Sequence, residues 1–243
     1  MTYLFRNLEF SQGWQHYAQM PPDYTDQSAN PYNGFSRSLA QGIPSPAQDG
    51  PCTAFGISGT VVGDALFTLP IIGQVSSQDI PDTAKTLLPS IHSMEYTGKF
   101  FISSADMPHV GAVELDVGIY MGEISMTFGT QIRIANVTGN SGPNGWDVWD
   151  NANEKWVFTG IRTYPVADEW NSFRIVVSRD SGNSMIYESL GLNRLNAQVS
   201  ELVSSAKNIA AQVGWWGLNI NFQVDGTGMP VTVYARDLSL YIG

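Results

Sequence analysis

The chain has 243 residues, of which only 14% are charged, and it carries a formal net charge of −10 with a pI near 4.5. This balance argues against nucleic acid as a partner, because binding to phosphates needs clustered Lys and Arg. It also disfavours an anionic membrane surface, and no apolar run approaches the length of a membrane-spanning helix. The 24 glycines, 13 prolines and 12% aromatic residues are typical of a loop-rich β protein.

Cysteine usage and the N-terminal residues bear on redox chemistry and location. Cys52 is the only cysteine, so the chain can form neither an intrachain disulfide nor a Cys/His zinc cluster. We expect Cys52 to be a small buried or loop residue. Met1–Phe10 lacks the basic start and long apolar core of a signal peptide, so a secreted or cell-surface location is expected only if a leader has been removed.

Short segments rich in β-branched and aromatic residues, separated by turn residues, predict strands along the whole chain. In chain order they are Tyr3–Phe10, Trp14–Met20, Ala54–Val62, Ala65–Ile72, Met94–Ser103, Val110–Met121, Ile124–Ala135, Trp146–Trp149, Lys155–Ile161, Ser172–Arg179, Met185–Leu192, Trp215–Val224 and Val231–Tyr241. Gly122–Glu123 and Asp180–Ser184 predict hairpin turns, and we expect the final two strands to pair. The pattern predicts an all-β, two-sheet antiparallel jelly-roll sandwich.

Three segments depart from the strand pattern. Residues 21–51 contain Pro-Pro, Asn-Pro and Asn-Gly pairs with little periodicity, which predicts a long ordered loop at one edge of the sandwich. Asp82–Leu88, between two prolines, fits one or two helical turns. Apolar residues within 197–213 follow i, i+3, i+4 spacing, which predicts a short inserted helix. Since no internal repeat or clear boundary is visible, residues 1–243 are expected to form a single domain.

Two predicted strands have one apolar and one polar side, in Val110–Met121 and Trp215–Val224. Alternation with a period of two describes a half-buried strand, so the polar side chains should line one face. These polar side chains are Glu114, Asp116 and Tyr120 in the first strand, and Asn219, Asn221 and Gln223 in the second. A face of carboxylates, amides and aromatic rings suits a polyhydroxylated ligand.

A series of short motifs follows from Met94 to Gly243. They are Phe100–Ile102, Ala112–Val117, Met126–Gln131, Trp146–Asp150, Lys155–Gly160, Trp170–Asn171, Gly214–Gly217 and Phe222–Gly226. In this order they resemble the concanavalin A-like lectin/glucanase superfamily, in particular bacterial jelly-roll domains that usually have no assigned activity. The resemblance implies two curved antiparallel sheets with a concave polar face.

The resemblance also implies where a hydrolase would carry its catalytic groups. Laminarinase-type glucanases of this superfamily have Glu-x-Asp-x-Glu or Glu-x-Asp-x-x-Glu on an equivalent strand, with the first Glu as nucleophile and the last as acid/base. Glu114 and Asp116 match the start of this motif, with Cα atoms about 6.5–7 Å apart, but Gly118 and Ile119 occupy the acid/base positions. Retaining hydrolysis needs both carboxyl groups, so the second group would have to come from elsewhere, and Asp147, Asp150 and Glu154 are candidates.

The alginate-lyase branch of the same fold uses a Gln/His/Tyr/Arg constellation. Gln131, Arg133 and Tyr120 supply three of these residue types, but none of the three histidines falls on the polar face. We expect Arg133 to pair instead with Glu114 or Asp116 across neighbouring strands.

Tryptophans supply apolar surface on which sugar rings stack. By alternation, Trp215 shares the face of Asn219, whereas Trp216 joins the core. Trp146 and Trp149 are three residues apart, so they should lie on opposite faces.

A loop of oxygen-bearing side chains is compatible with calcium. Its members are Asp147, Asp150, Asn151 and Asn153, and Asp225 is a further ligand of this kind. A surface turn rich in Asp and Asn explains the same residues, and no other cofactor is expected.

The sequence therefore predicts a lectin-like protein that binds a glycan or polysaccharide on the concave polar face, without catalysis. The expected ligand-binding residues are Glu114, Asp116, Tyr120, Gln131, Arg133, Trp149, Trp215, Asn219, Asn221 and Gln223. A glycoside hydrolase or polysaccharide lyase of the same fold is one alternative. The other is a structural or assembly protein whose aromatic face meets another protein, and an oligomer is compatible with each of these functions.

Overall fold

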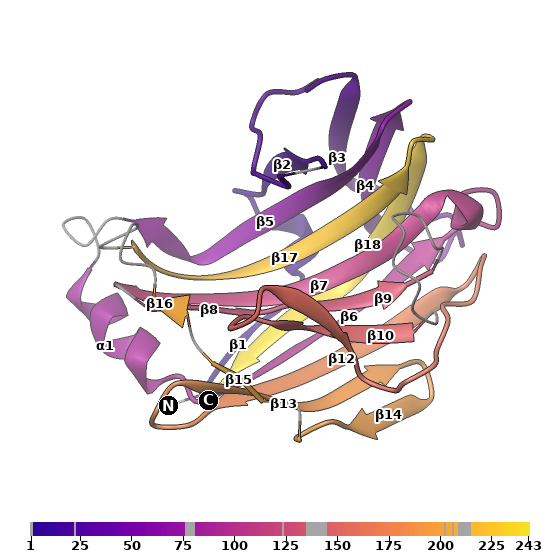
Figure 1. Cartoon of the computed structure of the whole chain (residues 1–243). Coiled ribbons are helices and arrows are strands. Elements are labelled where there is room, and N and C mark those ends of the chain that lie inside the picture. Colours follow the sequence, from indigo (N-terminus) through magenta and orange to yellow (C-terminus); the bar gives the residue numbers. More distant parts are fainter. Residues whose placement is uncertain are drawn as a thin grey trace.

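The computed structural model describes residues 2–21, 23–75, 81–122, 124–134, 145–201, 203–205, 207–208 and 215–243. Over these residues the chain forms two antiparallel β-sheets packed face to face (Figure 1). This confirms the predicted all-β, two-sheet antiparallel sandwich. The helix, α1 (Asp82–Ser90), lies where the flanking prolines predict helical turns. None of the described helices is long and apolar enough to cross a membrane.

Sheet A has nine strands in the order β14-β13-β12-β6-β18-β4-β3, with β1 paired to β18 and β15 paired to β13. They are β1 (Tyr3–Phe5), β3 (Phe35–Pro44), β4 (Pro51–Gly59), β6 (Ser93–Ile102), β12 (Trp170–Arg179), β13 (Ser184–Leu192), β14 (Leu195–Gln198), β15 (Val203–Ser205) and β18 (Val231–Ile242). Because β1 pairs with β18, the two ends of the chain lie side by side (Figure 1).

Sheet B also has nine strands, in the order β11-β10-β9-β7-β17-β5-β2, with β8 paired to β7 and β16 paired to β8. They are β2 (Gln15–Gln19), β5 (Val62–Val75), β7 (Val110–Gly122), β8 (Ile124–Phe128), β9 (Thr130–Arg133), β10 (Gly145–Asp150), β11 (Lys155–Phe158), β16 (Lys207–Asn208) and β17 (Trp215–Thr227). The long strands β5, β17 and β7 run side by side and curve together (Figure 1).

The core lies between the sheets and is filled by alternate residues of their strands. Phe55 of β4 stacks on Phe222 of β17 with ring centroids 4.5 Å apart, and it meets Phe67 of β5 edge-on at 5.0 Å. Burial of each such ring contributes roughly 1.5–3 kcal/mol. Trp146 is fully buried in this core. Cys52 is buried as well, which agrees with its expected place as a small buried or loop residue.

The prediction of a continuous loop over residues 21–51 is wrong in its second half, because Phe35–Pro44 forms β3. This strand pairs with β4 at the edge of sheet A. Its side chains alternate with a period of two, with Phe35 and Arg37 buried. Gly42 and Pro44 obscure that pattern, but an edge strand tolerates both residues because it lacks a partner on one side.

Two further predictions about strands and helices are corrected by the strand pairing. The described parts of 197–213 form the end of β14, a connecting segment at 199–201, β15 and β16 rather than a helix. Residues 202, 206 and 209–213 lie outside the described residues. Both β14 and β15 pair with β13, and this pairing outweighs the local helix preference that the spacing of apolar residues indicates. The final two strands also do not pair, since β17 belongs to sheet B and β18 to sheet A.

A glycine in β6 allows the core to close against it. A Cβ on Gly98 would lie 2.5 Å from Leu238 Cδ2 and 2.9 Å from Phe173 Cε1. We expect Gly98→Ala to lower the free energy of unfolding by about 1–3 kcal/mol, because both neighbours are buried. Gly182→Ala, in an exposed turn, is the control and should change it by less than about 0.5 kcal/mol. Equal denaturation midpoints for the two variants would contradict this packing.

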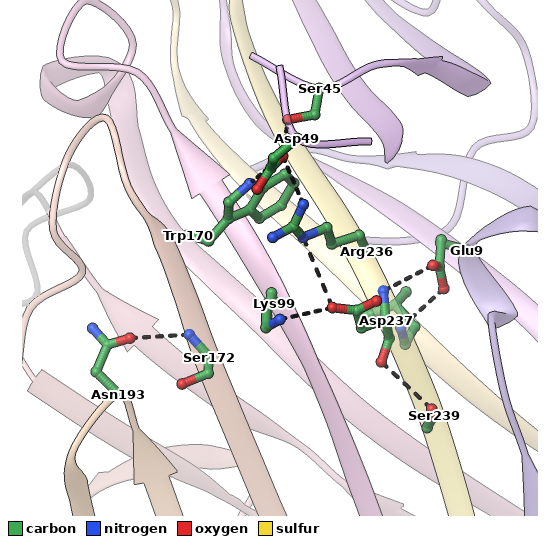
Figure 2. A network of polar contacts seen from close by, with 11 residues as sticks. Glu9, Ser45, Asp49, Lys99, Trp170, Ser172, Asn193, Arg236, Asp237 and Ser239 are labelled. Atoms are coloured by element: carbon green, nitrogen blue, oxygen red, sulfur yellow. Dashed lines mark hydrogen bonds and ion pairs between the residues drawn. The ribbon is translucent and has the colours of Figure 1, made fainter. Parts of the chain in front are cut away.

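A network of ion pairs and hydrogen bonds crosses the outer face of sheet A (Figure 2). Lys99 pairs with Asp237 at 2.9 Å, and Arg236 pairs with Asp49 at 2.7 Å. The Arg236 guanidinium lies 4.2 Å from the centroid of the Trp170 ring, whose Nε1 donates to Asp49. These contacts hold the turn after β3 against β12 and β18.

Candidate functional site

Strand register brings polar side chains into a row across the outer face of sheet B. Gln223 on β17 lies opposite Glu114 on β7, and Glu114 lies opposite Gln131 on β9. Gln131 in turn lies opposite Asp147 on β10. Neighbours in such positions have Cβ atoms about 4.5–5.5 Å apart, so the four side chains adjoin one another. We call this face the polar face; its described lining is Asp64, Thr68, Glu114, Asp116, Tyr120, Gln131, Arg133, Asp147, Trp149, Asn219, Asn221, Gln223 and Asp225.

A second row lies beside the first and is built from amides. Asn221 lies opposite Asp116 on one side and Thr68 on the other. Its Nδ2 donates to Asp116 Oδ2 at 3.4 Å, and its Oδ1 accepts from Asn219 Nδ2 at 3.2 Å. Asn219 Nδ2 also donates to Thr68 Oγ1 at 3.0 Å. These bonds hold both amides in fixed orientations on the polar face.

Four carboxyl groups lie near one another in these rows, and we call Asp64, Glu114, Asp116 and Asp225 the carboxyl cluster. Asp225 lies directly opposite Asp64, and Glu114 and Asp116 are only 7% and 6% exposed. Burial is the main cause that raises the pKa of every member, and those of Asp116 and Asp225 are raised to about 7. The cluster therefore retains protons near neutral pH, so its members donate as well as accept hydrogen bonds.

Arg133 is committed to a buried carboxylate rather than to the carboxyl cluster. Its Nη2 donates to Asp147 Oδ1 at 2.9 Å, its Nε forms an ion pair with Asp147 Oδ2, and Gln131 Nε2 donates to Oδ2 at 2.8 Å. The expectation that Arg133 pairs with Glu114 or Asp116 is therefore wrong. The alternation of β9 places Arg133 on the predicted face, but only the pairing of β9 with β10 selects its partner.

Half-buried aromatic rings border the polar face at the β10–β11 edge. Trp149 lies opposite Trp156, and the two indoles meet edge-on with centroids 5.3 Å apart. Gly129 lets Trp149 approach, since a Cβ at this glycine would lie 3.0 Å from the Trp149 Cβ. Phe158 lies opposite Asp147 and 5.8 Å from the Arg133 guanidinium. Such rings beside polar groups resemble the composition of small-molecule sites.

The opposite edge is approached by the segment that follows β2. Tyr24 in this segment is 40% exposed. Burial raises the pKa of its hydroxyl, and the nearby carboxyl groups of Asp64, Asp225 and Glu114 raise it further. Asp26 of the same segment accepts from Gln19 of β2 at 2.7 Å. This part of residues 21–51 is indeed a loop, and it lies beside the carboxyl cluster.

The structure places every predicted ligand-binding residue on the polar face except Trp215, whose side chain lies outside the described residues. Trp216 packs against the core, as alternation predicts. Trp146 and Trp149 lie on opposite faces, also as predicted. That these residues bind a ligand stays a prediction.

Sequence reasoning missed two members of the polar face. They are Asp64 and Thr68 on β5. It also missed three residues that border this face: Tyr24, and Trp156 and Phe158 on β11. In β5 the residues that face outward include Leu66 and Pro70. Most of the strand is therefore apolar, and the alternation of polar and apolar residues that marks the other strands is absent from its sequence. The signal available was Asp64 itself, a carboxylate inside an otherwise apolar strand.

The carboxylates of the loop that is compatible with calcium form hydrogen bonds within the protein. Asp147 is bound by Arg133 and Gln131, and Asp150 accepts from Ala152 N and from Asn153. Over the described ranges, no three His, Cys, Asp or Glu side chains lie close enough together to hold a metal ion. Asp147 and Asp150 therefore already have bonding partners within the protein, and calcium at this loop stays one of the two explanations that the sequence allows. Since both oxygens of Asp147 are engaged, we also assign it no acid or base role.

A separate hollow of about 440 Å³ lies on the outer face of sheet A. Its lining includes Lys99, Ser172, Arg174, Asn193 and Asp237. The charges here are already matched, because Lys99 pairs with Asp237 and Arg174 makes two bonds to Glu95 (Figure 2 shows the first pair). No aromatic ring faces outward in that lining, since Phe173 is buried. The polar face is thus the better candidate.

Comparisons with known proteins leave the family and the activity of this chain open. No family model matches the chain, and no curated protein matches it. Similar solved structures include lectins, carbohydrate-binding modules and an alginate lyase.

Three of these structures illustrate the degree of likeness. The cellulose-induced protein Cip1 has 10% identity and a TM-score of 0.49, over 97% of this chain and 96% of its own. Lectin II from Ulex europaeus has 7% identity and a TM-score of 0.49, over 100% and 97%. An alginate lyase Aly36B mutant in complex with alginate trisaccharide has 10% identity and a TM-score of 0.46, over 78% and 80%. Likeness of this degree assigns no ligand.

Proposed function

We propose that this protein binds a glycan chain on the polar face of sheet B. The observation that carries this proposal is a continuous polar row, Gln223–Glu114–Gln131–Asp147, that ends at a border of half-buried aromatic rings. Amide and carboxyl groups recognise hydroxyls, while indole rings pack against the C–H faces of sugars.

The direction of the row favours an extended ligand. The row runs across four neighbouring strands, which spans about 14–15 Å at a strand spacing of 4.7–4.9 Å. Trp149 and Trp156 stand beside one end of it, and Tyr17 and Tyr24 stand beyond the other. A chain of several sugars would contact more of this row than a single sugar would.

The test is an array of neutral and charged glycans and polysaccharides, in which each positive is scored for retention and for release of product. Retention without release supports a binding module. Release of product would contradict binding alone and would direct the search to a second carboxyl group beside Glu114. Retention of no glycan on the array would contradict the proposal and favour the alternative of a structural or assembly protein.

Trp149→Ala is expected to weaken glycan binding by about tenfold or more, because a stacking ring is an anchor of a binding surface. Isothermal titration of the strongest array positive measures this loss. The control is Trp170→Ala, which removes a half-buried tryptophan from the opposite sheet and should leave affinity within about twofold. Equal losses in both variants would show that the effect is on folding rather than on the polar face.

A further inference from the structure

The carboxyl cluster lies on the polar face without a positive charge between its members. Asp64 stands directly opposite Asp225, and Glu114 lies one strand further on, opposite Gln223. The other cross-strand partners of the cluster are uncharged: Gln19 beside Asp64, Gln131 beside Glu114 and Asn221 beside Asp116. Like charges in neighbouring positions of a sheet repel each other.

The one cation among the described lining residues is already neutralised. Arg133 contacts both carboxylate oxygens of Asp147, which is 2% exposed, and its own side chain is only 12% exposed. Arg133 is therefore not free to form an ion pair with an anionic ligand. No positive charge among the described lining residues would offset the repulsion between such a ligand and the carboxyl cluster.

We infer that the polar face accepts neutral glycan chains and rejects chains whose sugars carry carboxylates or sulfates. This inference rests on the proposed function, because it concerns the same surface. A uronate chain laid along the polar row would place its charges near Glu114 and Asp116, where little water reaches and screening is weak. The hydroxyls of a neutral sugar bond to carboxyl groups in either protonation state.

The preference for neutral over anionic glycan chains should increase as pH rises. Asp116 and Asp225 have pKa values raised to about 7, mainly by burial, so they are largely protonated at pH 5.5 and ionised at pH 8. Asp147 lies in the same row as Glu114 and is bonded to Arg133, and Asp26 acts on Tyr120 of the polar face from the loop after β2. The tyrosines nearest the cluster stay neutral over this range, because burial raises their pKa values as well: Tyr24, Tyr96, Tyr120 and Tyr187.

The experiment uses pairs of ligands that differ only in charge. Glucan, mannan and galactan oligosaccharides of six sugars are compared with the same chains after oxidation of their C6 hydroxyls to carboxylates. Isothermal titration is run at pH 5.5 and pH 8, at low and high salt. We expect the oxidised chain to bind at least tenfold more weakly than its neutral partner at pH 8. We expect a smaller ratio at pH 5.5 and at high salt.

A double substitution, Asp64→Asn with Asp225→Asn, should reduce the neutral-to-oxidised affinity ratio at pH 8 by at least fivefold. Glu95→Gln removes one carboxylate from the other sheet and should leave that ratio unchanged. Equal binding of both chains, or tighter binding of the oxidised one, overturns the inference while the proposed function stands. Binding of no glycan, neutral or oxidised, overturns both.

Discussion

The protein is expected to become less stable as pH rises from 5 to 8, which is opposite to the usual behaviour of paired carboxylates. A carboxyl group whose pKa is raised in the folded state binds its proton more tightly there than in the unfolded chain. Its contribution to stability is full below the unfolded pKa near 4 and is lost as pH rises through the folded pKa. For Asp116 and Asp225, with pKa values of about 7, the loss is on the order of 2–4 kcal/mol for each group.

Asp225→Asn should flatten this profile, because it removes one titrating group and keeps the shape of the side chain. Thermal unfolding at pH 5 and pH 8 measures the effect, and we expect the variant to melt about 3–8 °C higher than the parent at pH 8. Asp180→Asn is the contrast, since backbone and side-chain bonds from Ser184 lower the pKa of that exposed carboxyl. A melting temperature that rises from pH 5 to pH 8 in the parent chain would contradict the prediction.

Glu9→Ala is expected to lower the free energy of unfolding by about 2–4 kcal/mol. Glu9 lies in the short 3-10 helix Leu8–Phe10 and is 1% exposed. Its Oε1 accepts from Asp237 N at 2.8 Å and its Oε2 accepts from Leu238 N at 2.9 Å, as Figure 2 shows. Removal of the carboxylate leaves two backbone donors without partners, each at a cost of about 1–3 kcal/mol.

The position of these donors explains why Glu9 matters. Asp237 has a φ of 57° and lies in an irregularity of β18 between Arg236 and Ser239, where the regular pairing with β6 lapses. Glu9→Gln keeps one acceptor and should fall midway between the parent and Glu9→Ala in urea denaturation. An unchanged midpoint for Glu9→Ala would show that water replaces both bonds.

The fold could be predicted from the sequence because alternation survives in most strands. In β7 and β17 alternate apolar residues face the core, and the polar residues between them face outward. Glu114 and Asn221 therefore reach the polar face whichever strand lies beside them. The site could be located for the same reason. The polar residues of β7 and β17 can be assigned to one face from the sequence alone, without knowledge of which strands pair.

What the sequence did not reveal depends on which strands are neighbours. Asp64 joins the carboxyl cluster only because β5 pairs with β17, more than 140 residues away in the chain. Arg133 selects Asp147 only because β9 pairs with β10. The spacing of apolar residues within 197–213 indicates a helix, but β14 and β15 form instead because they pair with β13. Local patterns describe which face a residue takes, whereas its partner is set by contacts between distant segments.

The order of strands has a consequence for how the chain reaches its native state. β17 lies between β7 and β5 in one sheet, and β18 lies between β6 and β4 in the other. Both strands come from residues 215–243, so during synthesis each sheet stays in two halves until these residues leave the ribosome. Loop closure over such separations makes folding slow, on the order of milliseconds to seconds. The nascent chain consequently exposes unpaired strand edges, for which binding by a chaperone is the natural protection.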